Sequence, residues 1–202
     1  QTCALPIYTC GGLDEFSEMW AKRLASWGYF VITPDSYGAR DIQNACLGGA
    51  PPNNLVSDIA GALDFLDTRP EVLKGRIALL GNSAGGKLAI RAAQQRFGLA
   101  QRGLRGAVSL YGGPCSAGED RFVSLPLLAL MAEKDDWFPI AGCHAWAEAT
   151  PKPPLQAVFY QAHHGFDNSV IMNRAVPCRN GQCHLVYDAA VSADAEARAK
   201  AF

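Results

Sequence analysis

Apolar residues along the chain fall into two alternating patterns, short continuous runs and longer amphipathic stretches. The short runs have the length of buried strands, whereas the longer stretches repeat their apolar residues every three or four positions, as a helix does. In the helix expected from Asp14 to Trp27, Phe16, Trp20 and Leu24 share one face, and Gly28 ends it. This alternation predicts an α/β fold with a mostly parallel sheet and helices on both of its faces.

The predicted elements follow one another in a regular order. Strands are predicted at residues 5–9, 29–33, 76–80, 106–111, 127–131 and 155–160, and helices at residues 14–27, 55–68, 84–97, 140–149 and 189–201. Residues 38–54 are rich in Gly, Pro and Asn and predict a loop. We find no internal repeat and no linker, so residues 1–202 are expected to form a single domain.

Both ends of the chain have unusual features. The codons for Gln1 to Ile7 can be written as a sequence that resembles a widely used sequencing adapter, so we expect these residues to be non-native. The last predicted helix reaches Phe202 without a cap or stop signal. We therefore expect a truncated gene product that lacks the first strands of its fold, and marginal stability because an edge of the sheet is left unpaired.

Composition and charge exclude several classes of protein. Apolar residues make up 49% of the chain and charged residues 18%, which is enough to bury a core and excludes a disordered chain. The net charge is -1 and there is no basic stripe, so binding to nucleic acid or to an anionic membrane is not expected. No apolar run approaches the roughly 18 residues that a membrane-spanning helix needs.

A sharp turn that presents a nucleophile is predicted at Gly81-Asn82-Ser83-Ala84-Gly85-Gly86. This G-x-S-x-G motif follows a predicted strand and opens a predicted helix, which is the context that a strained strand-to-helix turn requires. Ser83 then lies at the carboxyl edge of the sheet, where parallel sheets bind ligands. A phosphate-binding loop is a weak alternative, because neither the Walker lysine nor a G-x-G-x-x-G motif is present.

Candidates for a general base and its acid partner follow two later strands. Asp135 and Asp136 come after the strand at 127–131, and His163 and His164 come after the strand at 155–160. A histidine there could accept the proton of the serine, and an aspartate could orient the histidine and stabilise its imidazolium form. From these positions alone, either aspartate could instead cap a turn and either histidine could lie in a surface loop.

Three segments together resemble the dienelactone hydrolase family of α/β-hydrolases: residues 81–86, Lys134 to Pro139, and His164-Gly165-Phe166. Residues 29–40 are similar to the family's fourth strand and the loop after it, and the resemblance extends from about Cys10 to Phe202. The family places its acid four residues before a proline and a Gly-Phe pair after its histidine. The resemblance therefore selects Asp135 over Asp136, and His164 over His163.

The resemblance implies a serine hydrolase with Ser83, Asp135 and His164 as its catalytic triad, acting on a small-molecule ester or lactone. The founding members carry a cysteine nucleophile, so Ser83 favours ordinary ester or lactone hydrolysis over the dienelactone substrate. Another acyl hydrolase or acyltransferase, a peptidase, or a non-catalytic binding domain are the alternatives. The oxyanion hole is expected from the backbone N–H groups of Cys10 and Ala84.

Two further expectations concern residues near the triad. The family usually has His-Gly before its Gly-rich turn, where this chain has Tyr8-Thr9, and the side chain of Cys10 in that turn is expected to be incidental. Trp137 and Phe166 flank triad residues, so each either lines the substrate pocket or belongs to the core.

Seven cysteines are present, and the pairing of six allows 15 connectivities. Cys178 and Cys183 lie close together across an Asn180-Gly181 turn, in what looks like an insert, and a disulfide there would indicate an exported rather than a cytoplasmic protein. A zinc site that includes His184 is the alternative, but it lacks a fourth ligand. No carboxylate cluster suggests a catalytic metal, so neither a metal nor a cofactor is expected. The sequence does not indicate an oligomeric state.

Overall fold

The computed structural model describes residues 1–7, 9–46, 55–171, 173–178 and 181–202. In this part of the chain six strands form one sheet in the order β2-β1-β3-β4-β5-β6, and every neighbouring pair is parallel. The strands are β1 (Cys3–Ile7), β2 (Phe30–Val31), β3 (Ile77–Asn82), β4 (Leu104–Leu110), β5 (Leu127–Ala132) and β6 (Leu155–Tyr160). All six carboxyl ends therefore meet at one edge of the sheet, as the sequence predicts.

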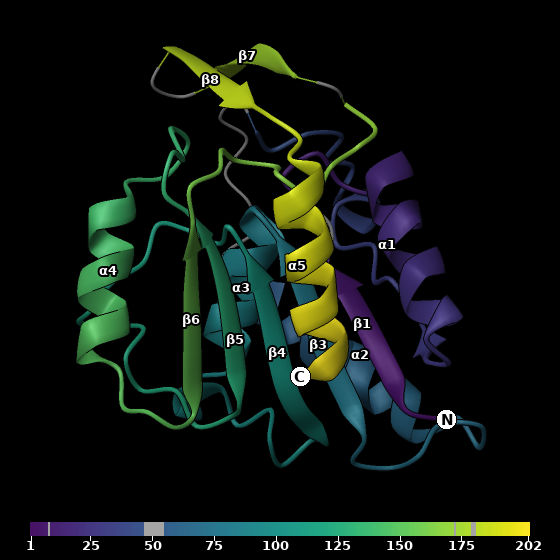
Figure 1. Cartoon of the computed structure of the whole chain (residues 1–202). Coiled ribbons are helices and arrows are strands. Elements are labelled where there is room, and N and C mark those ends of the chain that lie inside the picture. Colours follow the sequence, from purple (N-terminus) through teal and green to yellow (C-terminus); the bar gives the residue numbers. More distant parts are fainter. Residues whose placement is uncertain (8, 47–54, 172, 179–180) are drawn as a thin grey trace.

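Helices cover both faces of the sheet (Figure 1). They are α1 (Glu15–Ser26), α2 (Leu55–Asp67), α3 (Ala84–Ala92), α4 (Ile140–Ala149) and α5 (Ala189–Ala201). The buried apolar side chains of α2, α3 and α4 belong to one cluster, and those of α1 and α5 belong to another on the opposite face. Among the described helices, none is long and apolar enough to cross a membrane.

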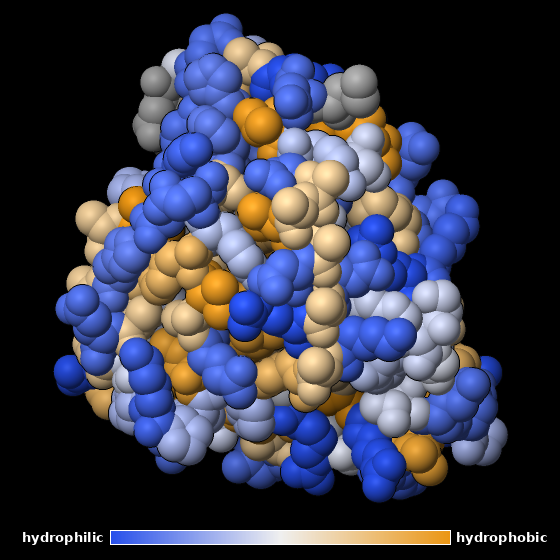
Figure 2. Space-filling view, in the orientation of Figure 1, coloured by the Kyte–Doolittle hydropathy of each residue, from blue (hydrophilic) through white to orange (hydrophobic). Residues whose placement is uncertain are grey.

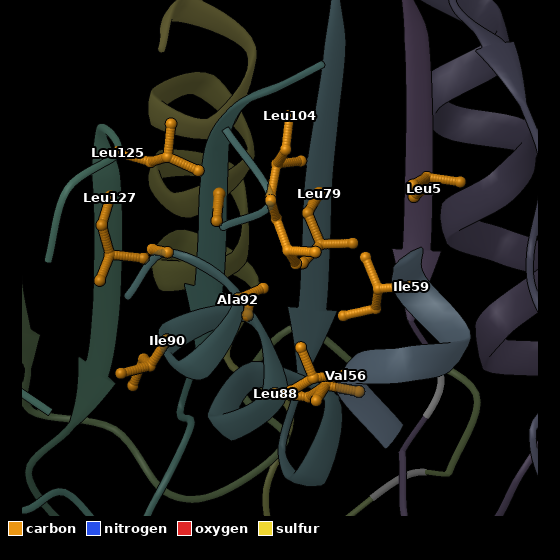
Figure 3. Close-up of a cluster of buried hydrophobic side chains, with 14 of the residues drawn as sticks. Leu5, Val56, Ile59, Leu79, Leu88, Ile90, Ala92, Leu104, Leu125 and Leu127 are labelled. Carbon is orange, nitrogen blue, oxygen red and sulfur yellow. The ribbon is translucent and has the colours of Figure 1, made fainter. Parts of the chain in front are cut away.

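The strands read as continuous apolar runs because both of their faces are buried. Successive side chains of a strand point to opposite faces, so Leu79 of β3 packs into the cluster with α2 and α3, whereas its neighbour Leu80 packs with α1 and α5. Figure 3 shows how side chains from several strands and from α2 and α3 converge on the first of these clusters. The second cluster is less completely covered, and Figure 2 shows apolar side chains at the surface over β5 and β6, between α4 and α5.

The first strand begins two residues earlier than expected. The prediction placed a short strand at residues 5–9, whereas β1 spans Cys3–Ile7 and lies between β2 and β3, with residue 8 outside the described part. Five of the seven residues expected to be non-native thus form an interior strand of the sheet, and their origin stays a prediction. Of the predicted strand at 29–33, Phe30–Val31 pairs with β1.

The predicted helix at residues 84–97 is too long, because α3 ends at Ala92 and a separate 3₁₀ turn covers Gln95–Phe97. Gln94 between them is extended, its side-chain amide donates to Asp120 Oδ1 at 2.7 Å, and its backbone pairs with Val123. These tertiary contacts interrupt a helix that the apolar periodicity alone would continue. In the predicted loop at 38–54, Gly38–Arg40 forms a second 3₁₀ turn, and residues 47–54 lie outside the described part.

The expected insert around the last two cysteines forms an antiparallel hairpin of β7 (Arg174–Cys178) and β8 (Gly181–Leu185). Asn180 of the predicted turn lies outside the described residues. The segment after β8 is bound to the loop that follows β6, since Val186 N–H donates to the His164 carbonyl at 3.2 Å and Asp188 N–H to the Phe166 carbonyl at 2.9 Å. The hairpin is thereby held over the carboxyl edge of the sheet (Figure 1).

Three disulfides are formed by the described cysteines: Cys10–Cys46, Cys115–Cys143 and Cys178–Cys183, with Cys3 left as a buried thiol. The last pair is the one that the sequence predicts, and it removes the thiolates that the zinc alternative needs. The side chain of Cys10 is not incidental, because its disulfide ties the turn after β1 to the segment before residue 47. Three disulfides favour the exported alternative, since such bonds persist in oxidising compartments.

The turn between β3 and α3 brings two stretches of backbone into very close contact. A Cβ atom on Gly81 would lie 2.1 Å from the carbonyl oxygen of Gly85, and a Cβ on Gly86 would lie 2.7 Å from the carbonyl oxygen of Leu110. Neither position has room for a side chain. Both glycines are therefore required by packing.

Replacing Gly81 by Ala should lower the free energy of unfolding by several kcal/mol, because the new methyl group meets backbone atoms that have no flexible end to move aside. Denaturant unfolding curves measure the loss. Gly61→Ala is the matched control: a Cβ at this position in α2 has nothing within 4 Å, and Ala is the better helix former. It should therefore raise stability by up to about 1 kcal/mol. Equal effects of the two changes would show that the close approach is not a constraint.

Replacing both Cys115 and Cys143 by Ala should lower the free energy of unfolding by about 3–4 kcal/mol, since the bond restricts a loop of 28 residues in the unfolded chain. The double Ala variant of Cys178 and Cys183, which are 5 residues apart, should lose about 2 kcal/mol by the same argument. Unfolding of the oxidised proteins in denaturant gives both numbers. A larger loss for the shorter loop would contradict the chain-entropy explanation.

Candidate active site

Ser83 occupies the turn between β3 and α3 in a strained backbone conformation, with φ 56° and ψ -118°. Non-glycine residues rarely adopt positive φ. The conformation is held from two sides, because Ser83 N–H donates to the Leu110 carbonyl at 3.0 Å and the Ser83 carbonyl accepts from Lys87 N–H at 3.0 Å. This turn places the serine side chain over the carboxyl edge of the sheet, at the amino end of α3.

Ser83, His164 and Asp135 lie in one chain of hydrogen bonds. Ser83 Oγ is 2.8 Å from His164 Nε2, and His164 Nδ1 is 2.7 Å from Asp135 Oδ2. The side chains of His164 and Asp135 are each 4% exposed. A carboxylate can only accept, so His164 Nδ1–H donates to Asp135, which leaves Nε2 free to accept the serine proton. The structure thus brings together the three residues that the family resemblance selects.

Asp135 is fixed by its own loop. Its Oδ1 accepts from the backbone N–H groups of Trp137 at 2.8 Å and Phe138 at 3.1 Å, which leaves Oδ2 for the histidine. These bonds hold the carboxylate in one orientation. They therefore also hold the ring of His164 in the orientation in which Nε2 faces the serine.

The neighbouring aspartate and histidine lie outside this chain of hydrogen bonds. Asp136 Oδ2 is 2.7 Å from His184 Nδ1, and its carboxylate also accepts from the His184 backbone N–H. Burial tends to raise the pKa of Asp136, but the hydrogen bonds and charge of His184 hold this pKa below its usual value. The ring of His163 faces His184, with 6.1 Å between ring centroids. Asp136 thus fastens the β7–β8 hairpin to the loop that carries Asp135.

Three aromatic rings enclose the imidazole of His164. Trp137 stacks on it at 5.4 Å between centroids, and Tyr111 and Phe138 meet it edge-on at 4.6 and 5.5 Å. The rings leave the imidazole little freedom to turn. Tyr111 has no motif to mark it in the sequence, where it is the last residue of a predicted strand; in the structure it directly follows β4.

A cavity of about 530 Å³ opens beside Ser83. This volume is typical of a site for a small organic molecule. Its walls are mostly apolar and include Trp137 and Phe138, and no carboxylate of the described residues lines it. Of the two aromatics expected as either pocket or core residues, Trp137 lines the cavity, whereas Phe166 is fully buried in the core.

The two residues expected to form the oxyanion hole line the same cavity as Ser83. Within the described part of the chain, the backbone N–H groups of Cys10 and Ala84 donate no backbone hydrogen bond. The turn that contains Cys10 is held by its disulfide to Cys46 and by a bond from Ala45 N–H to the Cys10 carbonyl at 2.8 Å. The sequence did not reveal this second support, because the pairing of six cysteines cannot be deduced from their spacing.

No group of three or more His, Cys, Asp or Glu side chains in the described ranges is placed to hold a metal ion. His164 contacts Ser83 Oγ, and Cys10, Ala84, Lys87 and Arg91 line the same cavity as Ser83. In the described part of the chain, the arrangement contains a hydroxyl, a base that can accept its proton, and N–H donors without a backbone partner beside a mostly apolar cavity.

Comparison with solved structures supports the fold. A proposed dienelactone hydrolase from Klebsiella pneumoniae subsp. pneumoniae MGH 78578 matches with a TM-score of 0.79 and 19% identity, covering 99% of this chain and 85% of that one. The dienelactone hydrolase-like promiscuous phosphotriesterase P91, from metagenomic libraries, matches with a TM-score of 0.75 and 20% identity, covering 100% of this chain and 84% of that one. The α/β-hydrolase MGS-M1, from a Medee basin deep-sea metagenome, has a TM-score of 0.57 and 16% identity and covers 84% of this chain and 74% of that one.

A search of curated proteins finds no match. The model of the dienelactone hydrolase family, however, matches residues 7–202, which is nearly the whole chain. Together with the parallel sheet and its helices on both faces, this match shows that the chain is an α/β-hydrolase that belongs to the dienelactone hydrolase family.

Proposed function

We propose that this chain is a serine hydrolase that cleaves carboxylic esters or lactones through an acyl-enzyme. The observation that carries the proposal is the continuous chain of hydrogen bonds from Asp135 through His164 to Ser83 beside an apolar cavity. A serine at its ordinary pKa is a poor nucleophile, and a hydrogen-bonded base is what activates it.

In the first half of the reaction, Ser83 Oγ attacks the carbonyl carbon of the substrate while His164 Nε2 accepts the hydroxyl proton. Asp135 stabilises the imidazolium that forms, and it holds the ring so that Nε2 stays directed at the reacting atoms. The negative charge that develops on the carbonyl oxygen is stabilised by the N–H groups of Cys10 and Ala84. His164 then returns the proton to the leaving alkoxide, and the bond between carbonyl carbon and leaving oxygen breaks.

In the second half, a water molecule attacks the acyl group on Ser83 and gives its proton to His164. Collapse of this intermediate returns the proton to Ser83 Oγ and releases the acid. With a lactone, the alcohol and the acid are parts of one molecule, so ring opening followed by hydrolysis gives a single hydroxy acid. The same residues serve both substrates.

The cavity supports a compact substrate with apolar groups, since Trp137, Phe138 and Leu88 line it. A peptidase or an acyltransferase on the same fold remains the second candidate, because the triad is common to all three classes. Substrates of the three classes distinguish them: p-nitrophenyl esters, lactones and peptide anilides, with an added alcohol as competing acceptor.

We also infer from the disulfides that the protein works in an oxidising compartment.

Ser83→Ala should lower ester hydrolysis by about a thousandfold or more and abolish labelling by a fluorophosphonate probe. The change removes the nucleophile, and the remaining oxyanion donors sustain a small remnant of the rate. Hydrolysis of p-nitrophenyl acetate and gel detection of the labelled protein measure the two effects. Labelling of the parent protein and none of the variant supports the proposal; a parent that neither labels nor hydrolyses any ester or lactone of the panel contradicts it.

Asp135→Asn should lower kcat by several orders of magnitude, up to about 10⁴-fold, because the amide favours the wrong histidine tautomer. Asp136→Asn is the matched control in the next position. Asp136 contacts His184 in a half-exposed pair whose loss costs about 1 kcal/mol or less, so its kcat should stay within about threefold of the parent. The same contrast is expected between His164→Ala and His163→Ala. An inactive Asp136→Asn beside an active Asp135→Asn would reverse the assignment.

A further inference from the structure

Asp167 is a buried carboxylate that the proposed chemistry does not use. It is 1% exposed and lies three residues after His164 in the loop that follows β6. Its Oδ2 accepts from Trp20 Nε1–H at 2.8 Å and from Asn82 Nδ2–H at 2.9 Å, and its Oδ1 accepts from the hydroxyl of Tyr111 at 2.6 Å. These partners come from three different elements: α1, the end of β3 and the residue after β4.

The hydrogen bonds fit the ionised form of Asp167. An indole and a side-chain amide both donate to one oxygen, and a phenol donates to the other, which is the pattern of donors that an ionised carboxylate accepts. Burial keeps the pKa of Asp167 above its usual value, and the hydrogen bonds from Tyr111 and Trp20 offset part of this rise. The pKa of Tyr111 is also raised, first by burial and then by the charge of Asp167, so the phenol stays a donor.

Burying an ionised group without a paired cation generally lowers stability relative to an apolar residue. The charge of Arg23 acts to lower the pKa of Asp167, but the Nε of Arg23 is paired with Glu196 at 3.2 Å. The network is therefore poorly explained as a device for stability. Two of its three donors, Asn82 and Tyr111, instead lie next to catalytic groups.

Two of these donors adjoin triad residues, one along the chain and one through a ring contact. Asn82 directly precedes Ser83 in the strained turn, and the ring of Tyr111 meets the imidazole of His164 edge-on. Tyr111 itself has a positive φ of 39°, as Ser83 has a positive φ of 56°. Such conformations persist where the surroundings hold them. Asp167 bonds to the side chains at or beside both of these positions.

We propose that Asp167 is a positioning residue, which acts through Asn82 and Tyr111 to set the distance and angle between Ser83 Oγ and His164 Nε2. The proposal rests on the proposed function, because Asp167 is assigned a role in positioning residues of the same triad. Proton transfer is steeply sensitive to this geometry, and a displacement of about 1 Å is able to lower a rate by 10²-fold. The network ties the turn after β3, the end of β4 and the histidine loop to one buried anion. The positions of Ser83 and His164 relative to each other are thereby fixed.

The test compares Tyr111→Phe and Asp167→Asn with the parent in hydrolysis of p-nitrophenyl acetate and in the rate of fluorophosphonate labelling. Tyr111→Phe keeps the ring against His164 and removes the hydroxyl. In Asp167→Asn the amide oxygen can still accept from Trp20 and Asn82, so the variant keeps most of its bonds without the charge. We expect kcat and the labelling rate to fall at least tenfold in both variants, with KM within twofold of the parent.

Thr150→Val is the matched control. Thr150 is also buried, and its hydroxyl donates to the Trp146 carbonyl at 2.7 Å at the end of α4, outside the triad and its cavity. Like Tyr111→Phe, this control removes a buried, hydrogen-bonded hydroxyl. The melting temperature of Thr150→Val should therefore fall about as much as that of Tyr111→Phe, while its kcat stays at the parent value.

The possible results separate this proposal from the proposed function. A parent that shows neither labelling nor hydrolysis overturns both. An active parent with kcat unchanged in Tyr111→Phe and Asp167→Asn overturns the positioning role alone. A rise in KM at constant kcat, or an equal loss of kcat in Thr150→Val, also overturns it, because the network would then shape the pocket or merely stabilise the fold.

Discussion

The close approach of α3 to the ends of β3 and β4 is the constraint on which the rest of the structure depends. Backbone atoms of the helix lie where Cβ atoms of Gly81 and Gly112 would be, at 2.1 and 2.3 Å from the nearest helix atoms. The chain must therefore reverse within a single residue, and Ser83 takes up the strain with its positive φ. That reversal lifts the hydroxyl above the sheet and at the same time aims the first N–H groups of α3 at the space in front of it.

The other groups of the site must meet the serine at this fixed point, and each reaches it from the end of a different parallel strand. Asp135 comes from the loop after β5 and His164 from the loop after β6, which are neighbours in the sheet. Backbone N–H bonds to the carboxylate hold the first loop, and the segment that leaves the β7–β8 hairpin holds the second. The parallel sheet thus brings the three loops to one edge, and local hydrogen bonds fix the orientation of the side chains that they carry.

The sequence predicts those parts of this arrangement whose cause is local. The strands are continuous apolar runs because both faces are buried, and Ser83, Asp135 and His164 stand in motifs just after three of them. The hairpin was missed because its side chains are mostly exposed, so no apolar alternation marks it. The end of α3 was missed because tertiary contacts of Gln94, rather than helix propensity, decide it.

The partners of Asp167 could not be predicted from the sequence, because they are 147, 85 and 56 positions away from it along the chain. An aspartate after His164-Gly165-Phe166 looks like an ordinary loop residue until the fold brings an indole, an amide and a phenol around it. The burial of that charge and the positive φ values of Ser83 and Tyr111 all act against stability. They lie together at the carboxyl edge, while the two apolar clusters occupy both faces of the sheet along its length. The fold therefore separates the region that stabilises it from the region where strain and buried charge hold the reacting groups in place.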